Sequence, residues 1–274
     1  MKTGIKAKLI ALDIDGTILD KPAGIDVPPA VTEAVKSARK LGVRVCLSSS
    51  RPCFFMDDAT DRLQGVDALI GCSGASIEIL GNPNASRGIE FYKDSLPAVL
   101  LKAVFDLAKE RDLHASFCTD KKILVCKKGP LDPPSGSDSA FEVLEDFALM
   151  EALKTCSFTC AYTFTAPGMP DSVVLAEPGL KEAAIHRSSK DCFVITNRGT
   201  DKGAGVLRLA EYWGIPKEAI LAVGNDENDV PMLTIAGAGV VVENGSPEAK
   251  EAADWIAPAV SEGGAAEAIR RFAL

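Results

Sequence analysis

Short apolar runs bounded by polar residues recur in the first third of the chain, at positions 8–14, 43–49 and 67–72. Uninterrupted apolar runs of this length are typical of strands that are buried on both faces, as in a parallel sheet. Between the first two runs, residues 28–42 carry apolar side chains at helical spacing and end at Gly42, which predicts a helix. This order of elements predicts parallel strands joined by right-handed crossovers.

The same rhythm returns near the C-terminus. Apolar runs predict buried strands at 219–224 and 238–242. Helical spacing predicts helices at 202–213, 247–253 and 262–273. Because both ends of the chain supply strands of the same buried type, we expect residues 1–82 and 192–274 to form one discontinuous α/β domain.

The middle of the chain, residues 83–191, follows a different pattern. Helices are predicted at 96–110 and about 140–154, strands at 113–118, 123–127 and 156–165, and a Pro- and Gly-rich loop at 129–139. The first two strands are joined by the polar segment TDKK and predict an antiparallel hairpin. No element is predicted over 166–191. We therefore expect residues 83–191 to be an α+β insertion between two halves of one sheet.

Composition narrows the functions that such a fold can serve. The chain has 274 residues, 47% of them apolar, and a net charge of −8, which argues against a nucleic-acid partner. No run approaches the roughly 20 apolar residues that span a bilayer, and the first apolar run is too short for a signal peptide. We therefore expect no membrane partner and a cytoplasmic location. The eight cysteines form no Cys-x-x-Cys pair, which is typical of buried thiols in a reducing compartment.

The strongest chemical signal is LDIDGTILD at 12–20. Asp13 and Asp15 stand at the end of a predicted buried strand, where open α/β sheets bind ligands. Two crowded carboxylates repel each other unless a cation joins them, so a metal with oxygen ligands is expected. A solvated strand-end turn is the simpler alternative, because Asp-Gly is a common turn pair.

Three later segments support the metal and add possible anion contacts. Ser48–Arg51 follows the second strand and offers hydroxyl groups to a phosphate, although a helix N-cap explains serines there equally well. Lys202 opens a predicted helix, where a lysine opposes the helix dipole unless an anion lies nearby; most lone lysines are simply solvated. GNDENDVPML at 224–233 places several possible oxygen ligands for a metal after a buried strand. The simpler alternative is an ordinary polar loop.

Together these segments resemble the haloacid dehalogenase-like (HAD) superfamily, in its Cof-type phosphatase branch. The motifs match in order and span essentially the whole predicted core: Asp13–Thr17, Ser49 ahead of Ser50-Arg51-Pro52, Lys202-Gly203, and Gly224–Asp229. The resemblance implies a Rossmann-like parallel-sheet core, with an α+β cap inserted between the second and third motifs that selects the substrate and closes over the site.

The resemblance also implies a reaction. Asp13 would attack phosphorus and become an acyl phosphate, while Asp15 would protonate the leaving oxygen and then activate water. Ser49 and Lys202 would hold the transferring phosphoryl group. The substrate would be a small phosphorylated metabolite, such as a sugar phosphate, and the cofactor Mg²⁺. The implied phosphate-binding residues are Ser49, Ser50, Lys202 and Asn228. The implied metal ligands are Asp13, the carbonyl of Asp15, Asn225 and Asp229.

The chain departs from the family pattern at three places. Asn225 stands where relatives usually have Asp, and Asp226 where a small residue is common. Ser49-Ser50 replaces Thr-Gly, and Ser73 replaces Asn. The first departure leaves Asn225, Asp226 or Asp229 to complete the metal shell, and we expect Mg²⁺ to bind more weakly than in an Asn225→Asp variant.

Two other functions are compatible with this pattern. A phosphomutase uses a similar core but returns the phosphoryl group to its substrate, and nothing in the sequence favours that return. A non-catalytic module that binds a phosphorylated ligand would not need Asp13, Asp15 and Lys202 together. We therefore expect a hydrolase.

Overall fold

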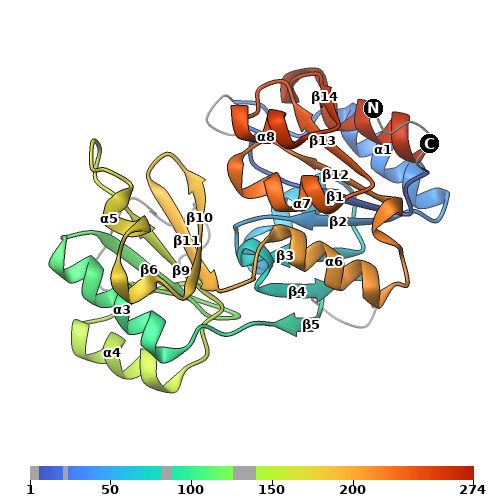
Figure 1. Ribbon diagram of the computed structural model, residues 1–274. Coiled ribbons are helices and arrows are strands. Elements are labelled where there is room, and N and C mark those ends of the chain that lie inside the picture. The colour runs from blue at the N-terminus through green and yellow to red at the C-terminus, as the bar shows by residue number, and fades with distance from the viewer. Residues whose placement is uncertain (1–5, 21–23, 82–87, 126–139) are drawn as a thin grey trace. The chain divides into compact units, whose positions relative to one another are not determined.

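The computed structural model describes residues 6–20, 24–81, 88–125 and 140–274. The chain divides into two compact units, Met1–Tyr92 with Asp201–Leu274, and Lys93–Thr200 (Figure 1). The first is a mostly parallel α/β unit and the second an α+β unit, so the predicted fold class is confirmed. Every described helix is too short or too polar to span a bilayer.

The described part of the first unit forms an eight-stranded sheet in the order β14-β13-β12-β1-β2-β3-β4-β5. Its strands are β1 (Leu9–Leu12), β2 (Arg44–Ser48), β3 (Ala68–Gly71), β4 (Ser76–Ile79), β5 (Ile89–Lys93), β12 (Ile220–Gly224), β13 (Ala238–Val242) and β14 (Trp255–Ala257). Neighbouring strands from β14 to β3 run parallel, and β4 is antiparallel to β3. The carboxyl ends of the central strands therefore lie along one edge.

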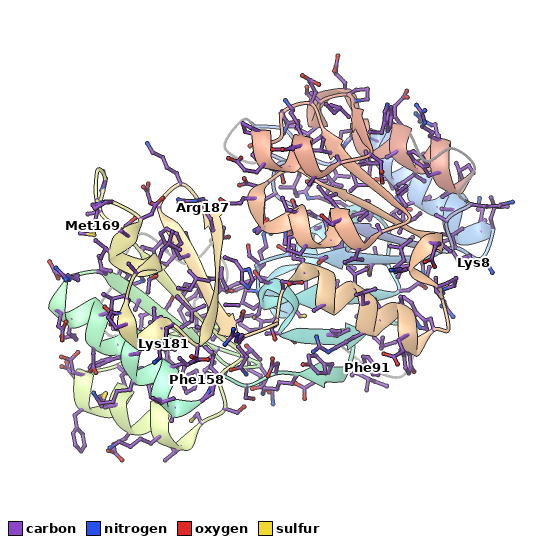
Figure 2. All side chains as sticks on the ribbon, in the orientation of Figure 1. Lys8, Phe91, Phe158, Met169, Lys181 and Arg187 are labelled. Atoms are coloured by element: carbon purple, nitrogen blue, oxygen red, sulfur yellow. The ribbon has the colours of Figure 1, made fainter. Side chains whose placement is uncertain are left out.

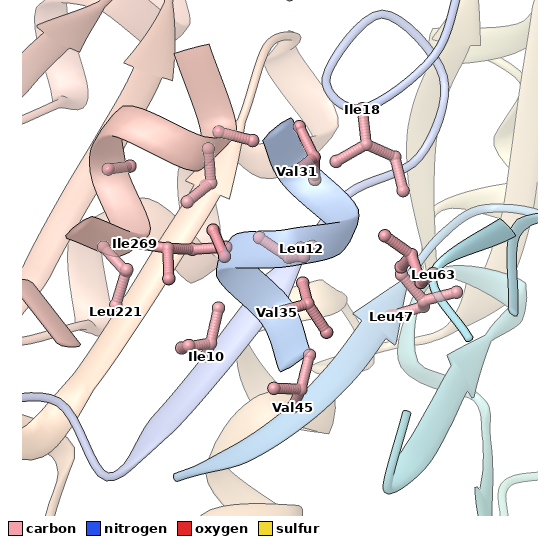
Figure 3. Packing of buried hydrophobic residues seen from close by; sticks show 14 of the residues in the cluster. Ile10, Leu12, Ile18, Val31, Val35, Val45, Leu47, Leu63, Leu221 and Ile269 are labelled. Carbon is pink, nitrogen blue, oxygen red and sulfur yellow. The ribbon is translucent and has the colours of Figure 1, made fainter. Parts of the chain in front are cut away.

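Helices cover both faces of this sheet. They are α1 (Pro29–Lys40), α2 (Asp57–Arg62), α6 (Lys202–Tyr212), α7 (Val230–Ile235), α8 (Pro247–Ala252) and α9 (Gly264–Ala273). Alternation along β1 sends Ile10 and Leu12 into a core shared with α1 and α9, as Figure 3 shows. Leu9 and Ala11 enter a second core with α6 and α7. Burial on both faces explains why β1 reads as a continuous apolar run.

The second unit has a six-stranded sheet within its described residues, in the order β10-β11-β9-β6-β7-β8. Its elements are α3 (Ala98–Glu110), β6 (His114–Cys118), β7 (Ile123–Val125), β8 (Phe141–Val143), α4 (Asp146–Thr155), β9 (Cys160–Phe164), α5 (Ser172–Leu175), β10 (Ala183–Ser189) and β11 (Cys192–Asn197). Helices α3 and α4 share a core with one face of the sheet. Phe158, labelled in Figure 2, lies in that core with its ring 6.3 Å from that of Phe117.

Two expectations need correction. The helix predicted over about 140–154 begins only at Asp146, because residues 141–143 instead form β8 and pair in parallel with β7. The boundaries at 82/83 and 191/192 move to 92/93 and 200/201, because β5 joins the first sheet and β11 pairs with β9 and β10 in the second. The antiparallel hairpin of β6 and β7 is confirmed. The loop predicted at 129–139 lies outside the described residues.

Candidate active site

Four segments of the first unit meet at the carboxyl ends of its central strands. Asp13 follows β1, which lies between β12 and β2 in the sheet. Ser49 follows β2 and Asn225 follows β12. Lys202 is the first residue of α6, which begins there because the side chain of Asp201 caps the helix.

Asp13, Lys202 and Asp229 form what we call the floor of the site, and their residues are 4%, 1% and 0% exposed. Lys202 Nζ donates to Asp13 Oδ1 at 2.7 Å, to Asp229 Oδ1 at 2.5 Å and to Asn228 Oδ1 at 3.3 Å. These three acceptors match the three protons of an ammonium group. With two carboxylates to one ammonium, the floor has a formal charge of −1.

Burial and neighbouring charges shift the pKa values of Asp13 and Lys202 in the floor. Burial raises the pKa of Asp13 to about 7, and Asp229 adds to the rise while Lys202 opposes it. Burial alone would lower the pKa of Lys202, but Asp13 and Asp229 outweigh it, so the pKa lies above its ordinary value and the lysine stays charged. A further cation beside Asp13 would favour its carboxylate form.

Asp229 supports the floor from within the loop after β12. Its Oδ2 accepts hydrogen bonds from the backbone N–H groups of Asn225 at 2.8 Å and Asp226 at 3.0 Å, while Oδ1 accepts from Lys202. Gly224 leaves room for this carboxylate, because a Cβ on Gly224 would lie 2.6 Å from Cβ of Asp229. The structure therefore places the Asp229 carboxylate on Lys202 and on the backbone of Asn225 and Asp226.

Asn225 reaches across to the Asp13 segment. One atom of its amide lies 3.0 Å from each of Asp13 Oδ2, the Asp15 carbonyl oxygen and Thr17 Oγ1. Thr17 Oγ1 in turn donates to Asp13 Oδ2 at 2.9 Å. Gly16, at φ +82°, turns the chain here, and a Cβ on it would lie 3.0 Å from Asn225 Cγ. Thr17 and Asn225 thus fix the second oxygen of Asp13.

Asp15 and Arg51 form a second charged region, which we call the rim. Arg51 Nε donates to Asp15 Oδ2 at 2.7 Å and Nη2 donates to Oδ1 at 2.5 Å, a two-pronged contact. The Asp15 side chain is 53% exposed and that of Arg51 20%. Arg51 also donates to the carbonyl of Phe55 at 3.3 Å. The guanidinium therefore holds the carboxylate of Asp15 in one orientation.

The two serines predicted to bind phosphate follow β2. Ser49 is buried, and its Oγ accepts a hydrogen bond from the backbone N–H of Arg51 at 3.2 Å. Within the described residues, the Ser49 hydroxyl makes no hydrogen bond to Asp13. Ser50 is half-buried next to it. The turn after β2 therefore places both serines at the edge of the sheet where Asp13 follows β1.

Comparison with known proteins identifies the family. A family model described as haloacid dehalogenase-like hydrolase matches residues 10–269. The chain belongs to this family. The resemblance on which the sequence analysis rests is confirmed, and so is its expectation of a HAD-type phosphatase.

Individual HAD-family relatives extend the comparison. The chain is 28% identical to the phosphoglycolate phosphatase of Methanothermobacter thermautotrophicus, over 97% of this chain and 98% of that one. It is 26% identical to the chloroplastic endoribonuclease YBEY of Arabidopsis thaliana, but spans only 47% of that longer protein. A solved HAD subclass IIB sugar phosphatase matches with a TM-score of 0.80 at 21% identity, over 97% of this chain and 99% of that one.

The donors at this site fit the magnesium ion that the HAD family implies. The Asn225 amide atom is 3.0 Å from both Asp13 Oδ2 and the Asp15 carbonyl oxygen. Neighbouring ligands of an octahedral Mg²⁺ with bonds of about 2.1 Å also lie about 3.0 Å apart. Asp226 is a poorer ligand here, because its Oδ1 accepts from the N–H of Glu227 at 2.8 Å. Asp13, the Asp15 carbonyl and the Asn225 oxygen would therefore hold the ion.

Sequence reasoning missed two residues of the site. Arg51 was noted only as part of a motif, yet it makes the two-pronged contact with Asp15. Thr17 was likewise noted only as the end of a motif, yet its hydroxyl donates to Asp13. An arginine two residues after a candidate phosphate-binding serine was the available signal for the first of these.

Proposed function

We propose that this chain is a magnesium-dependent phosphomonoesterase that forms an aspartyl-phosphate on Asp13. The observation that carries the proposal is the floor: two carboxylates and a lysine, all buried, at the carboxyl ends of the central strands. Apolar residues of similar volume usually stabilise a core as well as buried ion pairs do. The floor is therefore best explained by its chemistry.

In the first step, Asp13 Oδ1 forms a bond to phosphorus while the bond from phosphorus to the ester oxygen breaks. Asp15 gives its proton to that leaving oxygen. In the second step, Asp15 takes a proton from water, whose oxygen attacks phosphorus and releases inorganic phosphate together with the free Asp13 carboxylate. Splitting one displacement into two is covalent catalysis, and Asp15 is the acid and then the base.

The surrounding residues have positioning and electrostatic roles in this proposal. Lys202 orients Asp13 and balances charge as the phosphoryl group arrives, and the hydroxyl of Ser49 and the amide of Asn228 are further phosphate contacts. When bound, Mg²⁺ neutralises charge on the phosphoryl oxygens. Arg51 is a positioning residue that keeps Asp15 at the rim. Asp229 acts through Lys202 and the loop backbone.

We also propose that the second unit is the cap that selects a small phosphorylated metabolite. Its α3 and α4 share a core with one face of the sheet. By strand alternation, the opposite face carries His114, Ser116 and Tyr162 together with Cys118, Cys160 and Phe164. The three polar groups on this mixed face would suit a hydroxylated substrate such as a sugar phosphate. The cytoplasmic location and the absence of nucleic-acid and membrane partners stay predictions.

Phosphate release from an aryl phosphate and from a panel of metabolites tests the proposal. We expect turnover with Mg²⁺, its loss in EDTA, and its return when Mg²⁺ is added in excess. Binding of the same compounds without phosphate release would instead identify a binding module. Turnover only in the presence of a bisphosphate activator would identify a mutase.

A further inference from the structure

The amide of Asn225 can be oriented by counting protons. The atom that faces the Asp13 segment is 3.0 Å from a carboxylate oxygen, a backbone carbonyl oxygen and a threonine hydroxyl. The one proton of Thr17 Oγ1 is within reach of Asp13 Oδ2 at 2.9 Å and of this amide atom at 3.0 Å, and the charged carboxylate is the stronger acceptor. An amide oxygen in this position would face the carboxylate and the carbonyl with no proton between them, whereas a nitrogen supplies two protons, one for each. We therefore assign the facing atom as Nδ2.

This orientation is the reverse of what a cation requires. A divalent cation held by Asp13 and the Asp15 carbonyl takes an oxygen from Asn225, and an N–H group repels it. We propose that Asn225 is a two-position switch: in the metal-free protein its Nδ2 bridges Asp13 Oδ2 and the Asp15 carbonyl, and on cation binding the amide turns over to present Oδ1. The second half of this inference rests on the proposed use of Mg²⁺.

The position next to Asn225 allows this half-turn. Gly16 has no side chain, and a Cβ there would come within 3.0 Å of Asn225 Cγ. The two ends of an amide have nearly the same shape, so a half-turn exchanges donor for acceptor without moving the loop. Asn225 therefore holds the metal-free site together, at the cost of hydrogen bonds that must break when a cation binds.

A carboxylate at position 225 would weaken the metal-free site and strengthen cation binding. Without metal, it would bring acceptor oxygens against Asp13 Oδ2 and the Asp15 carbonyl and remove the protons that the Asn225 amide supplies to both, which is unfavourable beside the buried Asp13. With metal, it would be a charged ligand that needs no turn. Asn225→Asp should therefore lower stability in EDTA and tighten Mg²⁺ binding, two changes of opposite sign.

The test uses the full chain without substrate. Thermal unfolding in EDTA should show a melting temperature lower by roughly 3–10 °C in Asn225→Asp than in the wild type. Calorimetric titration should show Mg²⁺ binding that is tighter by about tenfold or more. Asn228→Asp is the matched control, because it adds the same charge in the same loop but faces the ammonium of Lys202 at 3.3 Å. Its melting temperature in EDTA should fall less.

Asn225→Ala keeps the test decisive if the aspartate variant does not fold. It removes the donor without adding charge, so it should also melt below the wild type in EDTA and bind Mg²⁺ more weakly. The wild-type side-chain amide signals in a ¹⁵N spectrum, assigned by their absence from Asn225→Ala, should shift on Mg²⁺ addition.

If both Asn225 variants melted at the wild-type temperature in EDTA, the proposed hydrogen bonds of Nδ2 in the metal-free protein would be overturned. If the wild type and Asn225→Asp bound Mg²⁺ with equal affinity, the proposed half-turn of the amide would be overturned. Neither readout involves turnover, so an inactive protein would reject the proposed function and leave this inference standing. Failure of the wild type to bind Mg²⁺ would reject the turn and the proposed cofactor together, while the EDTA comparison would still decide the metal-free half.

Discussion

The floor and the rim each pair an aspartate with a basic residue, and the two aspartates are only two positions apart in the chain. Asp13 is buried with Lys202 and Asp229, whereas the side chain of Asp15 is 53% exposed and contacts Arg51. Buried charges cannot exchange their partners for water, so removing one leaves the others uncompensated. Exposed charges are resolvated when a partner is lost. The floor should thus control both stability and chemistry, and the rim chemistry alone.

The largest expected effect is on turnover by Asp13→Asn. An amide cannot form the acyl phosphate, so kcat should fall by at least about ten-thousand-fold. The fold should persist, because the amide oxygen still accepts from Lys202. Steady-state phosphate release and circular dichroism check both halves, with Asp226→Asn as the control for an amide introduced nearby. More than a tenth of wild-type turnover in Asp13→Asn would contradict the mechanism.

Asp15→Asn should lose less. General acid and base catalysis contributes about a hundred- to ten-thousand-fold, and the nucleophile stays intact. The loss should be smaller for an aryl phosphate, whose leaving group needs little protonation, than for an alkyl phosphate. Parallel kcat/KM measurements on the two substrates check this, because kcat/KM covers only the steps up to departure of the leaving group. An equal loss on both would show that Asp15 does not protonate the leaving oxygen.

The free energy of unfolding should distinguish variants of the floor from variants of the rim most clearly. Lys202→Met leaves two buried carboxylates facing each other, which should reduce the free energy of unfolding by about 3–5 kcal/mol. Urea unfolding in EDTA measures this without interference from metal. The double variant Lys202→Met/Asp229→Asn should recover part of the loss. A single variant as stable as the wild type would mean that the floor is not charged as described.

Gly224→Ala should have an intermediate effect on stability. The new Cβ would lie 2.6 Å from Cβ of Asp229, so the loop must shift, at a cost of about 1–3 kcal/mol. An alanine at position 214 would be strained by the backbone φ of +64°, so Gly214→Ala cannot serve as the control. Ala222→Gly, in the same strand, gives a comparison that removes a methyl group. If Gly224→Ala had the same free energy of unfolding in urea as the wild type, the loop after β12 would not be tightly packed.

The smallest expected change in stability is that of Arg51→Gln. The side chains of its partners Asp15 and Asp58 are 53% and 35% exposed, so the free energy of unfolding should change by less than about 1 kcal/mol. Turnover should still fall, since Asp15 loses its fixed orientation. Arg51→Lys should recover only part of it, because a lysine cannot make the two-pronged contact. A stability loss as large as that of Lys202→Met would erase the distinction between floor and rim.

Sequence alone predicted the regular part of this molecule well. The strand predicted at 238–242 matches β13, and that at 219–224 matches β12 to within one residue. Strands buried on both faces carry a continuous apolar signal, which is hard to mistake. The rule that ligands bind at the carboxyl ends of parallel strands predicted a site at Asp13 and Asp15, and the family resemblance added Lys202, which lies on a helix.

Other features were beyond sequence reasoning for physical reasons. The edge strand β5 is largely exposed, so its pattern was too weak to extend the first unit past residue 82. β11 is buried and apolar like a core strand, and its run of residues does not say which sheet it joins. The orientation of the Asn225 amide depends on where one proton of Thr17 goes, which only three-dimensional contacts reveal.

Trapping of the intermediate tests the central proposal most directly. Wild-type protein and Asp15→Asn are mixed with substrate and Mg²⁺, quenched in acid within milliseconds, and reduced with borohydride, which converts an acyl phosphate to an alcohol. Mass spectrometry of the peptides should then locate homoserine at position 13, in greater yield for the variant that is slow to hydrolyse the intermediate. Phosphate release with an unmodified Asp13 peptide at every quench time, or modification at another carboxylate, would contradict the mechanism.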